Sequence, residues 1–181
     1  MTANGASGDV REELRAAVDG LSEARARTLL GWLRVDPRQR EPGAAGDQSV
    51  GPLGDTLGIV GEVLEPGYSR MRLDVDPAWH NPNGVLHGAV IYTMVDYSMG
   101  GTVQRGLPEN EYCATIEIKI NYLATVREGT LTAESRVVKQ GRNVAFTESK
   151  VTDGQQRLVA TASGSWYIFR PRPAGAEPAQ E

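Results

Sequence analysis

The sequence places one carboxylate where a folded protein would ordinarily avoid it. Asp96 follows Met94 and Val95 within residues 86–105, whose apolar residues predict a single long helix. Aspartate is a weak helix former, and burying its charge costs free energy unless the charge is paired. Partly apolar surroundings would raise the pKa of this carboxyl and suit it to general-base or nucleophilic catalysis. The alternative role is structural, in a hydrogen-bond network or at a wet interface between two chains.

The loop before this helix carries a second group of polar residues, with the sequence NPNGVLHG over residues 81–88. Unpaired N–H groups at a helix N-terminus, aided by the helix dipole, can stabilise an oxyanion. Gly88 would let a substrate carbonyl approach the backbone closely. Asn81 and His87 would add side-chain donors beside it. An ordinary loop and helix cap is the alternative interpretation of this segment.

The spacing of the two features predicts how they could act together. Gly88 and Asp96 are eight positions apart on one helix, which is roughly 12 Å along its axis. One carbonyl is therefore not expected to touch both residues of the same chain. If two such helices run antiparallel across a two-fold axis, Gly88 of one chain faces Asp96 of the other. This geometry predicts an obligate dimer with two active sites at the subunit interface.

The helix must be held by the strands predicted around it. Because residues 86–105 are apolar on nearly every face, they predict a buried helix. A strongly curved antiparallel sheet around one central helix is the economical way to bury it, and the open edges of such a sheet favour a dimer or a larger assembly. The predicted strands are two in a hairpin before the helix and four after it: 57–65, 68–75, 113–123, 129–139, 143–152 and 157–169.

The chain divides into four predicted regions. Residues 1–34 are expected to be a helical extension, with two short helices broken at Gly20 and an apolar stripe that must pack on the main domain or on a partner. Residues 35–56 are rich in proline and glycine and predict a linker. Residues 57–170 form the main domain, and residues 171–181 a disordered tail.

Composition narrows the classes of function. The 181 residues carry a net charge of −4, so no basic field indicates nucleic acid or an anionic membrane. The single cysteine excludes an internal disulfide and a cysteine-based zinc site, and we expect no metal. The N-terminus lacks the features of a signal peptide, and no window is apolar enough to span a membrane. We therefore expect a cytoplasmic protein.

The polar residues also match a known family. NPNGVLHG with Asp96, followed by TIEIKINYL (115–123) and VVKQGRNVAFTESKV (137–151), resembles the signature of hot-dog acyl-CoA thioesterases of the phenylacetate-pathway type. These enzymes belong to the 4-hydroxybenzoyl-CoA thioesterase-like superfamily, and the resemblance covers about residues 53–170. It implies an α+β hot-dog fold, in which a curved antiparallel sheet of about five or six strands wraps around one long central helix. It also implies thioester hydrolysis without a cofactor, because coenzyme A is part of the substrate.

The resemblance implies a role for each matching residue. The carboxylate of Asp96 would attack the thioester or activate water, and Gly88 would supply an oxyanion-hole N–H. Asn81 would position the thioester, while His87 would orient Asn81 or assist the leaving thiolate. Thr115, on the next strand, would position the attacking water.

Other residues are candidates for substrate binding. Ala89 stands where the family commonly has a second glycine, and its methyl group would narrow the site. Tyr92 is a candidate for the acyl pocket, although a residue in such a position is more often part of the core. Lys139, Gly141 and Arg142 lie at a predicted hairpin where the family commonly contacts the phosphates of coenzyme A. Ordinary solvated charges are the alternative there.

Three alternative functions stay open from the sequence. The acyl group could be attached to a carrier protein, with the N-terminal apolar stripe as a docking element. His87 and Asp96 could serve as the acid–base pair of an acyl-thioester hydratase or dehydratase. A non-enzymatic thioester-binding or assembly protein is the third. The sequence leaves open the identity of the acyl group and the choice between a homodimer and a dimer-of-dimers tetramer.

Overall fold

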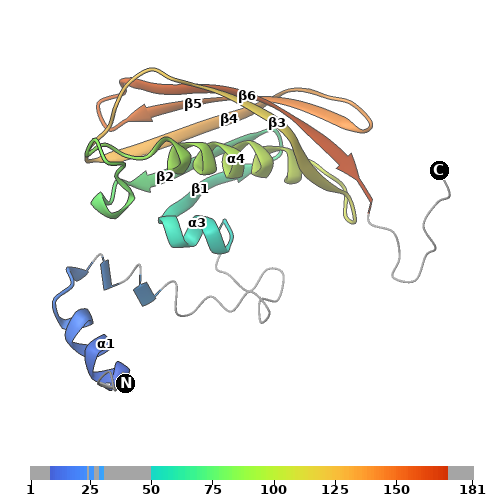
Figure 1. Cartoon of the computed structure of the whole chain (residues 1–181). Coiled ribbons are helices and arrows are strands. Elements are labelled where there is room, and N and C mark those ends of the chain that lie inside the picture. Colours follow the sequence, from blue (N-terminus) through green and yellow to red (C-terminus); the bar gives the residue numbers. More distant parts are fainter. Residues whose placement is uncertain (1–8, 24, 27–28, 31–49, 171–181) are drawn as a thin grey trace, which may run out of the picture. The chain divides into compact units, whose positions relative to one another are not determined.

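The computed structural model describes residues 9–23, 25–26, 29–30 and 50–170 (Figure 1). The chain forms two compact units, Met1–Arg40 and Glu41–Glu181. The first unit contains helix α1 (Val10–Asp19), which starts after Asp9 because the Asp9 carboxylate accepts a hydrogen bond from the Arg11 N–H at 3.0 Å. Most of the second predicted N-terminal helix, and the whole predicted tail 171–181, lie outside the described residues.

The second unit is a six-stranded antiparallel sheet with one long helix, α4 (Gly88–Gln104), against its concave face (Figure 1). The strand order is β1-β2-β4-β5-β6-β3, so β1 and β3 are the edges. The prediction of an α+β hot-dog fold is confirmed. A short 3₁₀ helix, η1 (Pro77–Trp79), lies in the loop before α4. The strands are β1 (Ile59–Glu65), β2 (Tyr68–Asp74), β3 (Tyr112–Tyr122), β4 (Thr130–Gln140), β5 (Val144–Asp153) and β6 (Leu158–Phe169).

The structure corrects the predicted linker 35–56 at its C-terminal end. Residues Pro52–Leu57 form a helix, α3, with proline in its first turn and Gly58 in the left-handed conformation at its end. Gly54 is buried, and a side chain there would meet the Tyr97 ring at 3.1 Å. Gly54, one of the glycines on which the linker prediction was based, therefore lets α3 pack closely on α4.

The interior between α4 and the sheet is apolar except for a cluster of hydroxyl groups. Met94, Val95, Met99 and Val103 of α4 are fully buried. Five buried side chains form the hydroxyl cluster: Ser69 on β2, Ser98 and Thr102 on α4, Ser135 on β4 and Ser149 on β5. Because each hydroxyl needs a partner in the interior, this cluster fixes the position of α4 along the sheet.

The hydrogen bonds of this hydroxyl cluster converge on Ser98. Its Oγ lies 2.8 Å from the Ser69 Oγ and accepts from the Ser135 hydroxyl at 2.7 Å. The Thr102 hydroxyl donates to Ser69 at 2.8 Å, and the Ser135 hydroxyl lies 2.9 Å from Ser149. Among the described residues no buried side-chain nitrogen or oxygen is left without a partner. Ser98 thus ties the central helix directly to β2 and β4, and Ser135 extends the cluster to Ser149 on β5.

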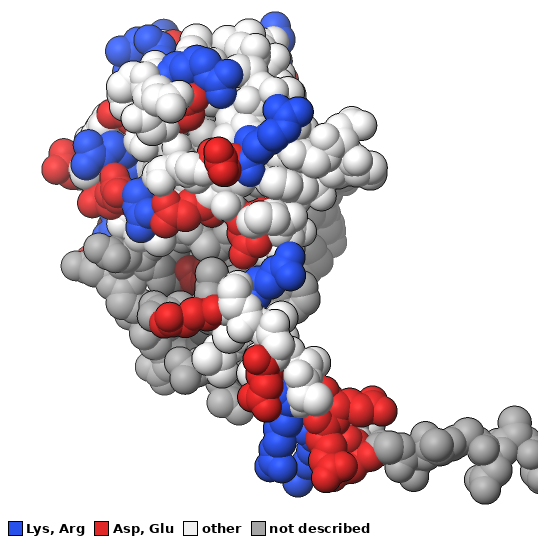
Figure 2. Space-filling view, turned by 90° about the vertical axis from the view of Figure 1, so that its left-hand side faces the viewer, with Lys and Arg blue, Asp and Glu red and all other residues white. Residues whose placement is uncertain are grey.

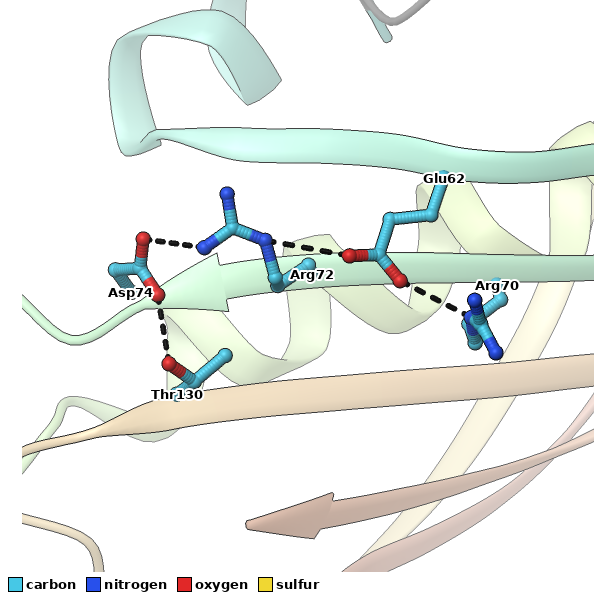
Figure 3. A network of polar contacts seen from close by, with 5 residues as sticks. All are labelled: Glu62, Arg70, Arg72, Asp74 and Thr130. Carbon is cyan, nitrogen blue, oxygen red and sulfur yellow. Dashed lines mark hydrogen bonds and ion pairs between the residues drawn. The ribbon is translucent and has the colours of Figure 1, made fainter. Parts of the chain in front are cut away.

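The two edges of the sheet differ in character. On β1 and its neighbours, Glu62 pairs with Arg70 at 3.0 Å and with Arg72 at 3.3 Å (Figure 3). Arg72 also pairs with Asp74, which accepts a hydrogen bond from the Thr130 hydroxyl on β4 at 2.7 Å. Each exposed ion pair contributes little stability, but together they make this edge polar.

The β3 edge, in contrast, exposes apolar side chains. Ile116 and Leu123 are each 56 % exposed, and Tyr112 and Tyr122 are nearly half exposed. The face shown in Figure 2 carries basic and acidic residues interspersed, in keeping with the small net charge. Within the described part of the chain no helix is long and apolar enough to cross a membrane.

The hydroxyl cluster generates a stability prediction. Ser98→Ala should lower the free energy of unfolding by about 0.5–1.5 kcal/mol, because it removes the hydroxyl that Ser69 and Ser135 both contact, while each of these keeps another partner. Urea unfolding at fixed protein concentration measures the change. Ser163→Ala, at an exposed position of β6, is the matched control and should change the stability by less than about 0.5 kcal/mol. Equal stability of the two variants would contradict a stabilising role for the cluster.

Candidate active site

Asp96 lies at the centre of α4, on the side that faces β3. Its Oδ1 accepts a hydrogen bond from the Thr115 hydroxyl at 2.9 Å. Thr115 pairs with Trp166 of β6, and the register of β3 shifts immediately after it, between Thr115 and Glu117. Bulges of this kind are frequent beside active sites, where they redirect a side chain. The structure thus brings together the two polar residues that the sequence placed on consecutive elements.

The surroundings of Asp96 change its acidity. Partial burial raises the pKa of the Asp96 carboxyl above its usual value, and the Thr115 hydrogen bond opposes this by stabilising the carboxylate. A carboxylate with a raised pKa binds a proton more readily than an exposed one. Asp96 is therefore equipped to take a proton from water or to attack a carbonyl carbon directly.

The start of α4 is built from His87 and Gly88. The His87 ring caps the helix, its Nδ1 accepting from the Ala89 N–H at 3.1 Å, which explains why α4 starts two residues after the predicted position. With Nδ1 as acceptor, a neutral ring carries its proton on Nε2. Gly88 is the first helical residue, and its N–H has no acceptor in the described part of the structure. This N–H is available to a ligand.

Asn81 is held in a tight turn before the helix. Its Oδ1 accepts from the Asn83 N–H at 2.9 Å, and its own N–H donates to the Val85 carbonyl at 2.8 Å. Within residues 50–170 there is no hydrogen bond between the side chains of Asn81 and His87. The two N–H groups of the Asn81 side-chain amide donate no hydrogen bond within the described residues and are available to a ligand.

A residue that the sequence did not single out, Tyr122, packs on Gly88. Its hydroxyl donates to the Gly88 carbonyl at 2.9 Å, and a side chain at position 88 would meet the Tyr122 ring at 3.2 Å. Thr115 and Tyr122 are seven residues apart, an odd spacing that points side chains to opposite faces of a regular strand. The bulge at Ile116 brings both onto the α4 side, and a residue pattern alone does not reveal it.

The structure keeps the Gly88 N–H and the Asp96 carboxylate apart within one chain. Gly88 contacts Tyr122, whereas Asp96, eight residues further along α4, contacts Thr115. Their separation along the helix axis is roughly 12 Å, as expected from the sequence. A single chain therefore does not bring the Gly88 N–H and the Asp96 carboxylate to the same place.

The candidate substrate-binding residues lie in two places. Ala89 and Tyr92 are exposed on the N-terminal half of α4. Lys139, Gly141 and Arg142 are exposed at the β4–β5 turn, where the Gly141 N–H donates to the Val144 carbonyl. Lys150, on β5 of the same hairpin, pairs in register with Glu134, eight residues beyond Arg142. That is roughly 27 Å along a strand, so Lys150 lies away from the turn that carries Lys139 and Arg142.

A pocket of about 370 Å³ opens beside Asp96. Gly100 and Gly101 form part of its wall, and a side chain on Gly100 would lie 3.0 Å from the Trp166 ring. Half-buried Cys113 also lines it, its thiol 3.6 Å from the Gly100 carbonyl. The full lining is Val50, Leu64, Met71, Asp96, Tyr97, Gly100, Gly101, Gln104, Arg105, Cys113, Ala114, Thr115 and Trp166. The carboxylate thus borders a largely apolar space.

Comparison with known proteins agrees with this geometry. The family model described as the thioesterase superfamily matches residues 83–160, which span the α4 entrance, Asp96 and Thr115. The provisionally named esterase SSO1253 of Saccharolobus solfataricus is 36 % identical over 114 residues, covering 63 % of this chain and 75 % of that protein. The chain belongs to the thioesterase superfamily. The prediction of a thioester hydrolase is thereby confirmed at the level of the family.

Two further similarities extend to solved structures and named enzymes. The 1,4-dihydroxy-2-naphthoyl-CoA hydrolase of Listeria monocytogenes is 28 % identical over 120 residues, covering 66 % of this chain and 98 % of that enzyme. A phenylacetic acid degradation-related protein of Ralstonia eutropha superposes with a TM-score of 0.62 at 25 % identity, covering 67 % and 93 % of the two chains. Both similarities fit the hot-dog fold of the thioesterase superfamily.

The Thr115 hydrogen bond generates a pH prediction. If deprotonated Asp96 promotes hydrolysis, kcat/KM falls as the pH drops through its raised pKa. Thr115→Val removes the hydrogen bond that lowers this pKa, so the acid limb of the pH profile should move to higher pH. Thr115→Ser keeps the donor and should retain the wild-type limb. An acid limb that stays in place, or moves to lower pH, in Thr115→Val would contradict this assignment.

Proposed function

We propose that the protein hydrolyses acyl-CoA thioesters at a site shared by two protomers, with Asp96 from one and the Gly88 N–H from the other. The observation that carries this proposal is the half-buried Asp96 carboxylate, held by Thr115 at the mouth of an apolar pocket. On the same helix, an unpaired N–H at the N-terminus is suited to a developing oxyanion. Thioester hydrolysis needs both groups.

The proposed reaction uses each of these groups once. Asp96 takes a proton from water, which attacks the thioester carbonyl, or attacks the carbonyl itself to give an anhydride that water then cleaves. The Gly88 N–H and the dipole of α4 stabilise the negative oxygen of the tetrahedral intermediate. The C–S bond then breaks, and the thiolate leaves and takes up a proton, for which the Nε2–H of His87 is a candidate donor. No cofactor or metal takes part in these steps.

The shared site is supported by the surfaces that one chain leaves open. Ala89 and Tyr92 are exposed on α4, and Ile116 and Leu123 are exposed on the β3 edge. An edge strand with exposed apolar residues favours pairing with a second strand. Joining two copies at β3 around a two-fold axis would cover these residues and run the two α4 helices antiparallel. We propose a homodimer as the smallest active unit; a dimer of dimers would keep the same site.

The choice of coenzyme A rests on charge and on similarity. Lys139 and Arg142 are exposed at the β4–β5 turn and could bind phosphate groups. The Listeria monocytogenes relative is named as a CoA thioester hydrolase. Exposed apolar residues on α1, Val10, Leu14 and Val18, favour a carrier-protein-bound acyl group as the second candidate. Hydrolysis of acyl-carrier protein, with no hydrolysis of acyl-CoA, would identify the carrier-protein-bound acyl group as the substrate.

The hydratase alternative receives less support. His87 and Asp96 are nine residues apart on α4, roughly 13 Å along its axis. The His87 Nδ1 is engaged in capping the helix. One chain therefore does not assemble a histidine–carboxylate pair. The proposed shared site would bring His87 near the partner's Asp96, and there the match to the thioesterase family favours hydrolysis over hydration.

The first test is substitution of the carboxylate. Asp96→Asn should reduce thiol release by at least about 100-fold, the effect expected from loss of a general base, and more if Asp96 is the nucleophile. The variant should fold with equal or higher stability at neutral pH. The reason is that a raised folded-state pKa stabilises the protonated form, and this contribution is lost as the pH rises through that pKa. Near-wild-type hydrolysis by a folded Asp96→Asn variant would contradict the mechanism.

The shared site is tested by mixing two inactive variants. Gly88→Pro removes the N–H at a helix position that tolerates proline, and Gly88→Ala, which keeps the N–H but adds a similar contact with Tyr122, is its matched control. After subunit exchange between Asp96→Asn and Gly88→Pro, half of the dimers should be mixed, each with one intact site. Activity should then recover to about a quarter of the wild type in a two-fold dimer. Confirmed mixed dimers without activity would place the complete site within one chain.

A further inference from the structure

The pocket beside Asp96 is a groove that follows one face of α4. The α4 positions that line it recur every fourth residue along the helix, which places them in one stripe. Asp96 and Thr115 lie at one end and Arg105 at the other, nine residues along the helix, or roughly 13 Å. The stripe consists of Asp96, Tyr97, Gly100, Gly101, Gln104 and Arg105.

The walls between these two ends are apolar. Leu64, Met71 and Trp166 line the groove from the sheet, and Val50 lines it from the residues before α3. Gln104 is polar, but its Nε2 donates to the Glu111 carbonyl at 2.9 Å and its Oε1 accepts from the Cys113 N–H at 3.1 Å. The walls therefore offer hydrocarbon contact along the groove.

This lining suits an acyl chain better than the pantetheine arm of coenzyme A. Pantetheine carries two amides, and a buried amide without a hydrogen-bond partner is costly. Gln104 is already satisfied by the backbone, so the Tyr97 hydroxyl is the main side-chain group between Asp96 and Arg105 that could pair with those two amides. An alkyl chain has no such requirement and gains free energy from apolar burial.

Arg105 gives the far end of the groove a positive charge. It is the exposed C-cap residue of α4, and in the described part of the chain its guanidinium has neither an ion pair nor a hydrogen bond. By contrast, Arg70, Arg72, Arg136 and Arg157 all pair with carboxylates of the sheet or its loops. Arg105 is thus a cation available at the end of an apolar groove.

We infer that the groove holds the acyl chain and that Arg105 binds a carboxylate at the end of that chain, selecting monothioesters of dicarboxylic acids. A guanidinium binds a carboxylate through two parallel N–H···O hydrogen bonds. The roughly 13 Å between Asp96 and Arg105 favours medium-length acids over short ones, because a short chain positioned at Asp96 does not reach the guanidinium. This inference rests on the proposed function and names its substrate class.

The test compares acyl-CoA pairs that differ only in a terminal carboxylate: butyryl with succinyl, hexanoyl with adipoyl, and octanoyl with suberoyl. For the two longer pairs, the ratio of kcat/KM for the diacid over the monoacid should fall about fivefold in Arg105→Gln, the upper range for a solvent-accessible ion pair. The succinyl-to-butyryl ratio should stay unchanged. Arg105→Lys should retain part of the preference, and Arg136→Gln, on the outer face of β4, should leave all the ratios at the wild-type value.

Three results would overturn the inference, and they have different meanings. If Arg105→Gln hydrolyses all the thioesters with unchanged diacid-to-monoacid ratios of kcat/KM, Arg105 does not bind the terminal carboxylate of the acyl chain. An equal loss on hexanoyl-CoA and adipoyl-CoA, absent with the corresponding pantetheine thioesters, would assign Arg105 to a phosphate of coenzyme A. Lack of hydrolysis of every thioester by the wild-type protein would overturn the proposed function together with this inference.

Discussion

The interaction on which the site depends is the hydrogen bond between the Thr115 hydroxyl and the Asp96 carboxylate. Partial burial alone raises the pKa of Asp96, and this single bond limits the rise. Apolar packing and the Ser98 hydroxyl cluster hold α4 against the sheet. Because Asp96 lies on α4, its carboxylate has a fixed position against β3. A less buried Asp96 would be a weaker base.

A second constraint is that one helix, α4, carries both residues proposed for the chemistry. Gly88 at the start of α4 and Asp96 at its centre cannot contact the same carbonyl, since the helix separates them by roughly 12 Å. A two-fold axis between two chains would overcome this separation, because two antiparallel α4 helices would place Gly88 of each chain near Asp96 of the other. On this account, catalysis and assembly depend on the same exposed surface of α4 and β3.

Much of this arrangement could be predicted from the sequence. The strands and α4 follow from alternation and helical periodicity, and Asp96 follows from its place on the buried helix. Thr115 follows from the family resemblance. Tyr122 could not be found, because the bulge at Ile116 changes which face its side chain occupies. Gly54 was assigned to a linker because close packing of a glycine is a tertiary contact. Arg105 was missed because an arginine at a helix end has no distinctive local pattern, and only the groove gives it a role.

The most direct measurement of the central claim is a ¹³C NMR titration of protein labelled at aspartate side-chain carboxyl carbons. Asp96→Asn would assign the resonance. The account predicts that Asp96 titrates at a higher pH than an exposed aspartate, and at the same pH as the acid limb of kcat/KM for thiol release. An Asp96 resonance with an ordinary pKa, or one that titrates well away from that limb, would contradict the account.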